Sequence, residues 1–396
     1  MTKATHLTSD VFDVAIIGAG PGGLCAAHAL AKLGLSIGVF EQAHALRPIG
    51  AALGLGDMGY AALAEISVEL AHQVRALAVN PKQQLLMRPN GEVLFADESP
   101  LAGTGFTWLG WYNLQNCLHQ SLPTTVSLYL NHALTGFTRE ADWGERQLRL
   151  QFRQQEDVCA RLLIGADGYN SVVRKITVAD GAPLYTGTMT WRGIVTQKNL
   201  IPLAYPFVEA AGFQLVVGER KNFWIKNAGP ELIAWGGTAP CLNQAKSASA
   251  LEKVLQIFKQ WPPLIERVIR ATAPEAIVET GVFDREATPQ WGDGRRVTLL
   301  GDAAHPMRPS LGLGTTMAIQ DAVTLAKKLT STDLNDEERL GIALCAYEQE
   351  RIAITAPLQQ KARQAGAETH ADHQADRLKE GFEAALAARK QTSQKH

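Results

Sequence analysis

Three short glycine-containing segments, far apart in the chain, carry the residue types that could bind a ligand. They are Gly18-Ala-Gly-Pro-Gly-Gly23, Gly165-Ala-Asp-Gly168 and Gly301-Asp-Ala-Ala-His305. The first has the glycine spacing of a turn whose backbone N–H groups bind a diphosphate. The other two place an aspartate beside glycine directly after an apolar run, where a carboxylate can bind hydroxyl groups of a ligand. Each segment alone is a weak signal, but together they predict that one long ligand is held at several points.

The first segment lies between a predicted strand and a predicted helix. Residues 11–17 form a β-branched apolar run, typical of a parallel strand buried on both faces, and residues 24–33 carry apolar residues at helical spacing. Gly18 permits the tight turn, Gly20 lets the backbone approach a diphosphate, and Gly23 lets the helix pack against the strand. A strand–turn–helix without a ligand is the alternative, but the order of these elements favours binding.

Glu41 stands at the end of the next predicted strand, residues 36–40, about 20 residues beyond the glycine turn. A carboxylate at this spacing accepts hydrogen bonds from the hydroxyl groups of a ribose. Because a carboxylate would repel a 2′-phosphate, Glu41 favours FAD or NAD over NADP as the ligand of this turn.

Asp167 and Asp302 follow apolar runs at residues 161–165 and 297–300, which are predicted as further parallel strands. The carboxyl ends of such strands are where open α/β sheets bind their ligands. A simple turn or a helix start, with no ligand, is the alternative at each aspartate. Their order in the chain after a phosphate-binding turn favours a role in binding.

The composition of the loop that follows Asp302 would allow its backbone to contact a ligand closely. Residues 305–314 contain two prolines and two glycines, so the loop is stiff yet allows close approach of the backbone to a ligand. Thr315 or Thr316 is predicted to cap the helix over residues 317–329. The N-terminus of that helix would favour the negative charge of a reduced flavin.

The three segments together resemble the single-component FAD-dependent aromatic hydroxylases, a family that includes p-hydroxybenzoate and salicylate hydroxylases and, more distantly, zeaxanthin epoxidase. The resemblance extends from residue 11 to about residue 363 and includes Leu46-Arg-Pro-Ile-Gly50, Trp191-Arg-Gly-Ile-Val195 and Tyr347-Glu-Gln-Glu-Arg351. It implies an FAD-dependent monooxygenase that uses NAD(P)H and molecular oxygen to hydroxylate or epoxidise a small to medium organic substrate, expected to be aromatic, through a flavin hydroperoxide. An FAD-dependent reductase or dehydrogenase of the same fold, or a non-catalytic flavin-binding protein, is the alternative.

The resemblance also implies which residues hold FAD. The first turn would bind the diphosphate, Glu41 the adenosine ribose and Asp302 the ribityl chain. Asp167 with Gly168 would serve FAD and the path of transiently bound NADPH or NADH, and the loop over 309–314 would lie against the isoalloxazine ring. The implied FAD-binding residues are Gly18, Gly20, Pro21, Gly22, Gly23, Glu41, Gln42, Arg47, Asp167, Gly168, Gly301, Asp302, Pro309, Gly312, Leu313, Gly314 and Thr315.

The chain departs from the family pattern at three places. Trp111 stands where the family has an arginine that helps to hold FAD, and Gln320 stands where glutamate is usual. Leu313 stands where glutamine is common, with Thr315 and Thr316 in place of a small residue and asparagine. These departures predict a divergent member with the same chemistry.

The sequence offers only weak candidates for a catalytic residue, namely Arg192, His305 and Pro309. His305 could act as a general acid or base near neutral pH, but its place in an Ala-His-Pro turn favours a structural hydrogen bond. Arg192 could bind an acidic substrate through two N–H groups, or it could form an ordinary salt bridge. The sequence contains no HExxH motif and no cysteine spacing typical of a metal site, so we expect no metal.

Composition and charge narrow the class of protein. The 38 lysines and arginines are balanced by 39 aspartates and glutamates, so no basic surface for nucleic acid is expected. The five cysteines are scattered without a CxxC pair, which is typical of reduced thiols and a cytoplasmic location. Residues 14–31 lack lysine, arginine, aspartate and glutamate, but their glycines and Pro21 argue against a membrane span. We expect a monomer or homodimer whose partners are a small-molecule substrate and oxygen.

A length of 396 residues predicts two packed domains of the α/β class. We expect a Rossmann-like FAD-binding domain with a parallel sheet, interleaved with a mostly antiparallel β-sheet substrate domain and followed by a C-terminal helical region. No second GxGxxG follows a strand, so no separate nicotinamide domain is expected. The predicted FAD-binding domain comprises residues 1–75, 100–180 and 280–335, the substrate domain 76–99 and 181–279, and the helical region 336–396. Strands of the substrate domain are expected near 185–195, 212–217, 222–227 and 231–238. Trp191, Trp224 and Trp235 are expected in its core, with stacking on a substrate as the alternative. The tail beyond about residue 364 is expected to be a solvated helix that frays at its end.

Overall fold

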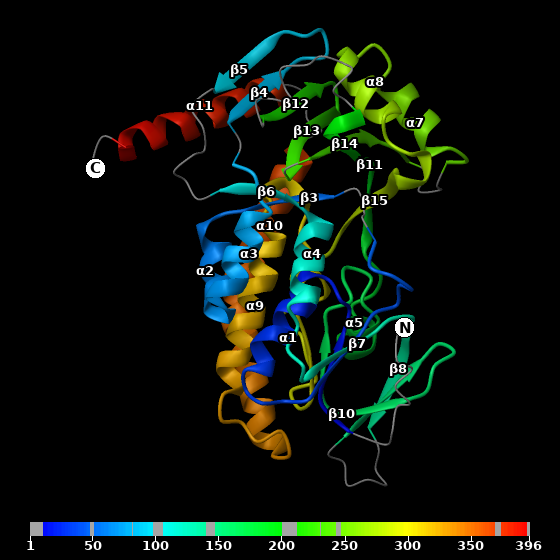
Figure 1. The fold of residues 1–396 in the computed structure, drawn as a ribbon, viewed down its shortest axis with the longest axis vertical. Coiled ribbons are helices and arrows are strands. Elements are labelled where there is room, and N and C mark those ends of the chain that lie inside the picture. Colours follow the sequence, from blue (N-terminus) through cyan, green and yellow to red (C-terminus); the bar gives the residue numbers. More distant parts are fainter. Residues whose placement is uncertain are drawn as a thin grey trace.

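The computed structural model describes residues 11–47, 51–80, 82–97, 106–139, 147–199, 212–229, 231–242, 247–368 and 374–393. Two large sheets lie one above the other in Figure 1, with helices beside the lower sheet and across the upper one. This is the interleaved α/β architecture that the sequence predicts, with the C-terminal residues in helices. Within the described ranges, no helix combines the length and the apolar character needed to cross a membrane.

The lower sheet is mostly parallel and its parallel strands are apolar. Its strands follow the order β7-β2-β1-β10-β9-β8, and β16 also pairs with β10. The pairs β7–β2, β2–β1, β1–β10 and β10–β16 are parallel, and β9 and β8 continue the sheet in antiparallel fashion. Strands covered on both faces favour the β-branched residues found here. The bounds are β1 (Phe12–Ile17), β2 (Ile37–Phe40), β7 (Val126–Tyr129), β8 (Leu134–Arg139), β9 (Leu148–Phe152), β10 (Val158–Gly165) and β16 (Val297–Leu299).

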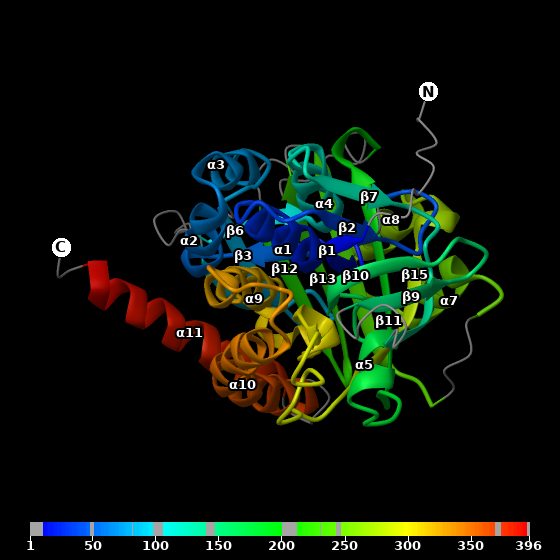
Figure 2. The ribbon, with the colours of Figure 1, turned by 90° about the horizontal axis from the view of Figure 1, so that it is seen from below.

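Helices from distant parts of the chain pack beside the lower sheet. In Figure 2, α1, α9 and α10 lie in a row, so the first helix of the chain packs against the late helix α9, and α9 separates it from α10. Several buried residues of α1 are glycine or alanine, namely Gly23, Ala26, Ala27 and Ala29, and their small size allows close packing. The helices are α1 (Pro21–Ala31), α2 (Asp57–Ile66), α3 (Val68–Ala76), α4 (Trp111–Gln120), α5 (Val172–Thr177), α9 (Gly314–Leu329) and α10 (Glu337–Glu368).

The upper sheet is mostly antiparallel and contains the strands predicted for the substrate domain. Its order is β15-β11-β14-β13-β12-β4-β5, and only the β12–β4 pair among these is parallel. A separate antiparallel pair, β3 (Ala52–Leu55) and β6 (Thr107–Gly110), lies between the two large sheets in Figure 1. The bounds are β4 (Gln83–Met87), β5 (Val93–Asp97), β11 (Leu184–Thr196), β12 (Gly212–Gly218), β13 (Lys221–Gly229), β14 (Leu232–Pro240) and β15 (Val278–Asp284).

Only one face of the upper sheet is covered by α7 (Ala250–Ile257) and α8 (Pro263–Arg270), and Pro262 and Pro263 stand at the start of the second of these helices. Trp191 and Trp235 are fully buried in the core beneath these helices, as predicted. Trp224 is different, because its neighbours Phe223 and Ile225 belong to that core and successive side chains of a strand point to opposite faces. The prediction of a core position is therefore wrong for Trp224, which is half-buried on the open face.

The last helix packs against the edge of the upper sheet. One face of α11 (Gln374–Ser393) places Ala375 and Phe382 against β5 and β12, and the rings of Phe382 and Phe95 stack with centroids 5.4 Å apart. The prediction of a fully solvated tail is therefore wrong on this face, because the apolar residues of α11 are spaced to form a stripe. Figure 1 shows the helix lying across β4 and β5.

Gly23→Ala should destabilise the lower half of the fold. A Cβ atom at Gly23 would lie 2.1 Å from the carbonyl oxygen of Gly18, so the helix and the turn would have to separate. We expect a loss of about 1–3 kcal/mol in the free energy of unfolding, measured by chemical denaturation. The control is Gly381→Ala in α11, where a Cβ meets no atom within 4 Å and stability should not fall. Equal stability of Gly23→Ala and the parent protein would contradict this packing.

Candidate functional site

The fold brings the three glycine-containing segments to one edge of the lower sheet. They follow β1, β10 and β16, whose carboxyl ends meet because these strands are parallel. Backbone hydrogen bonds join the segments, from the Ala166 N–H to the Ile17 carbonyl at 2.8 Å and from the Leu300 N–H to the Gly165 carbonyl at 2.9 Å. Residues separated by almost 300 positions in sequence therefore form one continuous surface.

The first turn leaves the start of α1 open. Gly18 has φ +106°, and a Cβ there would lie 2.4 Å from the carbonyl oxygen of Ala166, so only glycine fits against the second segment. Gly20 is the N-cap residue of α1, no side chain caps the helix, and a Cβ at Gly20 would meet no atom within 4 Å. Pro21 begins the helix, where its missing N–H costs nothing. The free N–H groups of the first turn thus face space that a diphosphate could fill.

Glu41 is held beside this turn by backbone groups. Its two carboxylate oxygens accept hydrogen bonds from the N–H groups of Ala19 and Ala43, each at 2.9 Å. Each oxygen keeps a second lone pair for a ribose hydroxyl. Gln42 and Arg47, also predicted near the ligand, are exposed, and residues 48–50 lie outside the described residues.

Asp167 is engaged within the protein by the start of α5, whose N-cap residue is Ser171. Its carboxylate accepts hydrogen bonds from the Ser171 hydroxyl at 2.5 Å and the Val172 N–H at 2.7 Å. Burial raises the pKa of Asp167, and these hydrogen bonds offset part of that increase. Gly168 has φ +77°, which lets the chain turn sharply between β10 and α5. The second segment thus fixes the direction of α5.

Arg174 on α5 then connects the second segment to the third. It is fully buried, and its guanidinium donates to the carbonyl oxygens of Ala303 at 3.0 Å and Ala304 at 2.6 Å and pairs with Asp180 at 2.6 Å. The sequence analysis does not predict this role, although Arg174 follows the second segment by only six residues and its position was a signal that could have suggested it. Arg174 fixes the backbone of the turn that contains Asp302.

The third segment is held from its other side by Asp321 on α9. This buried carboxylate accepts hydrogen bonds from the Gly301 N–H at 2.9 Å, from His305 Nε2 at 2.5 Å and from Arg351 Nε at 2.6 Å. Burial alone would raise the pKa of Asp321, but the contacts with His305, Arg351 and Gly301 outweigh it and hold that pKa below its ordinary value. His305 is itself fully buried, so its position supports the structural alternative over general acid–base catalysis.

Asp302 is the acidic residue that the third segment leaves free. Its side chain is exposed, and among the described residues no hydrogen bond or ion pair engages its carboxylate. Desolvation by the surrounding protein nevertheless raises the pKa of Asp302; His305 opposes this increase and the charge of Asp321 adds to it. The Asp302 carboxylate is therefore accessible from solvent and available to accept hydrogen bonds from a ligand.

The start of α9 lies next to Asp302. A Cβ atom at Gly314, the first residue of α9, would be 3.8 Å from the Oδ1 atom of Asp302. The N-cap residue is Leu313 and no side chain caps the helix, so the predicted cap by Thr315 or Thr316 is wrong. The helix begins earlier than predicted because η5 (Pro309–Leu311) ends at Gly312, which adopts φ +64° and redirects the chain.

These features fit an extended dinucleotide such as FAD. The glycine turn leaves a cradle that a Cβ at Gly20 would enter, and Asp302 has no partner within the described chain. The N-termini of α1 and α9 are both free of side-chain caps. Trp111 is the first residue of α4 and supplies no guanidinium, so the arginine of the family pattern has no substitute at this position.

Arg192 and Pro309, the other catalytic candidates, lie in different surroundings. Arg192 on β11 is half-buried on the open face of the upper sheet and makes one long hydrogen bond, 3.4 Å to the Thr280 hydroxyl. Its Nε atom has no hydrogen-bond partner in the described part of the chain, and burial lowers its pKa. Pro309 is exposed at the start of η5.

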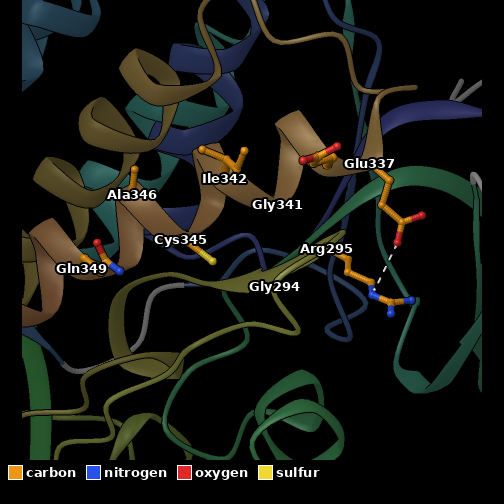
Figure 3. Close-up of a pocket in the computed structure, with 9 residues that line it drawn as sticks. Gly294, Arg295, Glu337, Gly341, Ile342, Cys345, Ala346 and Gln349 are labelled. Atoms are coloured by element: carbon orange, nitrogen blue, oxygen red, sulfur yellow. Dashed lines mark ion pairs between the residues drawn. The ribbon is translucent and has the colours of Figure 1, made fainter.

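A hollow elsewhere on the molecule contains none of the predicted residues. Figure 3 shows it between the outer face of α10 and the loop before β16, with an ion pair between Arg295 and Glu337 at 3.7 Å. This loop precedes β16, so the hollow lies at the amino ends of the parallel strands, opposite the edge that carries the glycine segments. It is therefore not part of the candidate site.

Comparisons with known proteins find similarity to FAD-binding proteins and monooxygenases. The family model described as an FAD binding domain matches residues 11–362. Aurachin C monooxygenase/isomerase of Stigmatella aurantiaca is 31% identical over 348 residues, which cover 86% of this chain and 85% of that protein. 3-Amino-4-hydroxybenzoate 2-monooxygenase of Streptomyces cremeus is 29% identical over 361 residues, 90% of this chain and 87% of that protein. The structure of Klebsiella pneumoniae HpxO complexed with FAD and uric acid is similar in fold, with a TM-score of 0.77 and 24% identity over 94% of this chain and 92% of that one.

Asp321→Asn should destabilise the protein strongly. The change removes a buried charge that compensates Arg351, and breaking such a pair costs about 3–5 kcal/mol. Because the folded pKa of Asp321 is depressed, its stabilisation is present above the ordinary carboxyl pKa of about 4 and is lost as pH falls through the lower folded value. Denaturation of the variant should therefore show a weaker loss of stability in acid.

The matched control is Glu266→Gln, which removes an exposed pair with Arg270. It should change stability by less than about 1 kcal/mol. If Asp321→Asn were equally mild, the carboxylate would not hold the third segment as described.

Proposed function

Because the chain belongs to the FAD-binding domain family of flavin-dependent monooxygenases, we propose that it uses NAD(P)H and molecular oxygen to hydroxylate or epoxidise a ring-containing organic substrate. Membership of this family confirms the resemblance seen in the sequence and favours a monooxygenase over a reductase or a non-catalytic flavoprotein. When bound, FAD supplies the route by which electrons from NAD(P)H reach oxygen. The observation that carries the proposal is the unpartnered Asp302 carboxylate beside the uncapped start of α9, on the same sheet edge as the glycine turn.

In this proposal the residues of the sheet edge hold FAD from end to end. The N–H groups after Gly20 bind the diphosphate, and Glu41 accepts hydrogen bonds from the adenosine ribose. Asp302 accepts hydrogen bonds from the ribityl hydroxyls. The residues from Pro309 to Thr315 lie near the ring system, where the positive end of the α9 dipole favours negative charge.

Asp167 has a positioning role in this proposal. Its carboxylate is engaged by Ser171 and the start of α5, and it acts on the site through Arg174, which donates to the backbone beside Asp302. Gly168 and the exposed Tyr169 follow it at the sheet edge and are candidates for contact with the nicotinamide cosubstrate.

The open face of the upper sheet is proposed to orient the substrate and to exclude water. Trp224 and Arg192 lie on this face, and Tyr169, which directly follows the second segment, opposes the lowering of the Arg192 pKa by burial. Tyr169 also stacks on Phe283 of β15 with ring centroids 5.6 Å apart, so this side of the upper sheet lies beside the edge that carries the proposed FAD-binding residues. A cytoplasmic location and a monomeric or homodimeric state are part of the proposal. The former is supported by the five cysteines, all in the described ranges, which form no disulfide.

Asp302→Ala should lose FAD without losing its fold. Hydrogen bonds to a charged group contribute about 1.5–3 kcal/mol, so the dissociation constant for FAD should rise about 10- to 100-fold. The measurement is flavin absorbance of the purified protein, followed by titration of the apoprotein with FAD. Exposed Asp57→Ala is the control and should retain flavin. If the purified Asp302→Ala variant carried a full complement of FAD, Asp302 would not be part of the FAD site.

Ring compounds should stimulate oxidation of NAD(P)H with matching oxygen uptake. The FAD-loaded protein is screened with phenolic and heteroaromatic compounds, and products are examined for one added oxygen atom. NADH and NADPH are compared in parallel. Turnover that continues without oxygen would instead indicate a reductase, and the absence of any turnover would contradict an oxygenase of ring compounds.

A further inference from the structure

Two basic side chains lie on the face of the upper sheet that α7 and α8 leave open. Lys226 on β13 and Arg192 on β11 point to this face, because Ile225 and Trp191 beside them lie in the core on the other face. In the described part of the chain, neither of them forms an ion pair with an acidic residue. The sheet register also places the buried acidic residue Asp97 of β5 on this face, but three strands away from Lys226. The part of the face around Lys226 and Arg192 is therefore positive and favourable for an anion.

Lys226 is the more buried of the two and is enclosed by aromatic rings. It is 7% exposed, and its Nζ atom lies 4.0 Å from the ring centroid of Trp108 and 4.5 Å from that of Trp224. Burial lowers the pKa of Lys226 to about 7. Trp108 belongs to β6, outside the upper sheet, so the amine is held between two separate parts of the fold.

The residues of β14 beside Lys226 and Trp224 are small. Ala234 lies opposite Lys226, and Gly236 lies opposite both Trp224 and Arg192. A Cβ at Gly236 would be 2.4 Å from the Trp224 indole, so the indole covers β14 at this point. Trp224 therefore lies between the two cations, with its ring over the backbone of the central strand.

We propose that this face binds the ring of the substrate against Trp224 and that the ammonium group of Lys226 binds an anionic oxygen carried by that ring. The inference rests on the proposed function and names the substrate class of the same site. It identifies Lys226 as a residue that determines specificity for negatively charged ring compounds.

The surroundings of Lys226 favour an anion supplied by a ligand. Aromatic faces attract an ammonium group, but they accept no hydrogen bond as strong as that of a carboxylate or phenolate oxygen. A neutral ligand would remove water from the Nζ atom without replacing it, whereas an anionic ligand would pair with it. Arg192, whose Nε atom has no hydrogen-bond partner in the described ranges, adds positive potential from the other side of Trp224.

The test compares benzoate with benzamide, which have similar size but differ in charge. FAD-loaded protein is titrated with each compound by calorimetry at about pH 6, where the ammonium group is protonated. Benzoate should bind at least about tenfold more tightly than benzamide. Lys226→Met should remove this preference and leave benzamide binding unchanged, and Lys226→Arg should retain most of it.

Lys221→Met is the matched control. Lys221 lies on the same strand, but its Nζ atom donates to the Ile257 carbonyl at 3.3 Å on the side covered by α7. This variant should keep the preference for benzoate. If Lys226→Met does not fold, Lys226→Gln tests the same loss of charge.

Three outcomes would overturn the assignment of Lys226. They are equal affinity of the parent protein for the two compounds, binding of neither, and a preference for benzoate that survives loss of the charge at Lys226. Oxygen-dependent NAD(P)H oxidation stimulated by neutral rings would still support the proposed function. Failure of the two proposals is therefore distinguishable.

Discussion

The buried carboxylate of Asp321 is the constraint on which the candidate site depends. It accepts hydrogen bonds from the Gly301 backbone, from His305 and from Arg351, which belong to the third segment and to α10. A buried carboxylate is costly unless its oxygens are fully engaged, so these three donors are fixed relative to α9. The turn after β16 thereby acquires one conformation, and α10 becomes part of the cofactor-binding half of the molecule.

The acidic residues of the glycine-containing segments divide into two kinds. Asp167 is satisfied inside the protein by Ser171 and the start of α5, whereas Asp302 has no partner among the described residues. A carboxylate already engaged by the fold has little capacity left for a ligand, and a free one has its full capacity. Two similar sequence patterns therefore have different roles: Asp167 holds the start of α5 in place, and Asp302 is proposed to bind the ligand.

The sequence predicts local structure well and long-range partners poorly. The strands and the glycine turn at Gly18–Gly23 follow from the spacing of residues that are close together in sequence. The bonds of Arg174 to Ala303 and Ala304 join positions about 130 apart in sequence, and no local pattern specifies them. The start of α9 was misplaced for a related reason, since it depends on the left-handed Gly312 before it and not on the threonines that resemble a cap.

The face occupied by Trp224 and Lys226 was equally hidden from the sequence. Alternation along β13 places these residues on the same side, but only the packing of α7 and α8 decides which side becomes the core. The prediction treated three tryptophans alike, and the register of β13 with β14 separates Trp224 from the other two. Side-chain environment in a sheet is thus a tertiary property even where the strands themselves are evident.

The link from Arg174 to the third segment ends on backbone carbonyl oxygens and not on side chains. It therefore places no chemical requirement on the residue types at positions 303 and 304. Substitutions there can accumulate in related chains without any compensating change at 174, provided that the side chains are small enough for their buried positions. Methods that infer spatial proximity from correlated substitutions would accordingly overlook this connection, even though it joins α5 to the third glycine-containing segment.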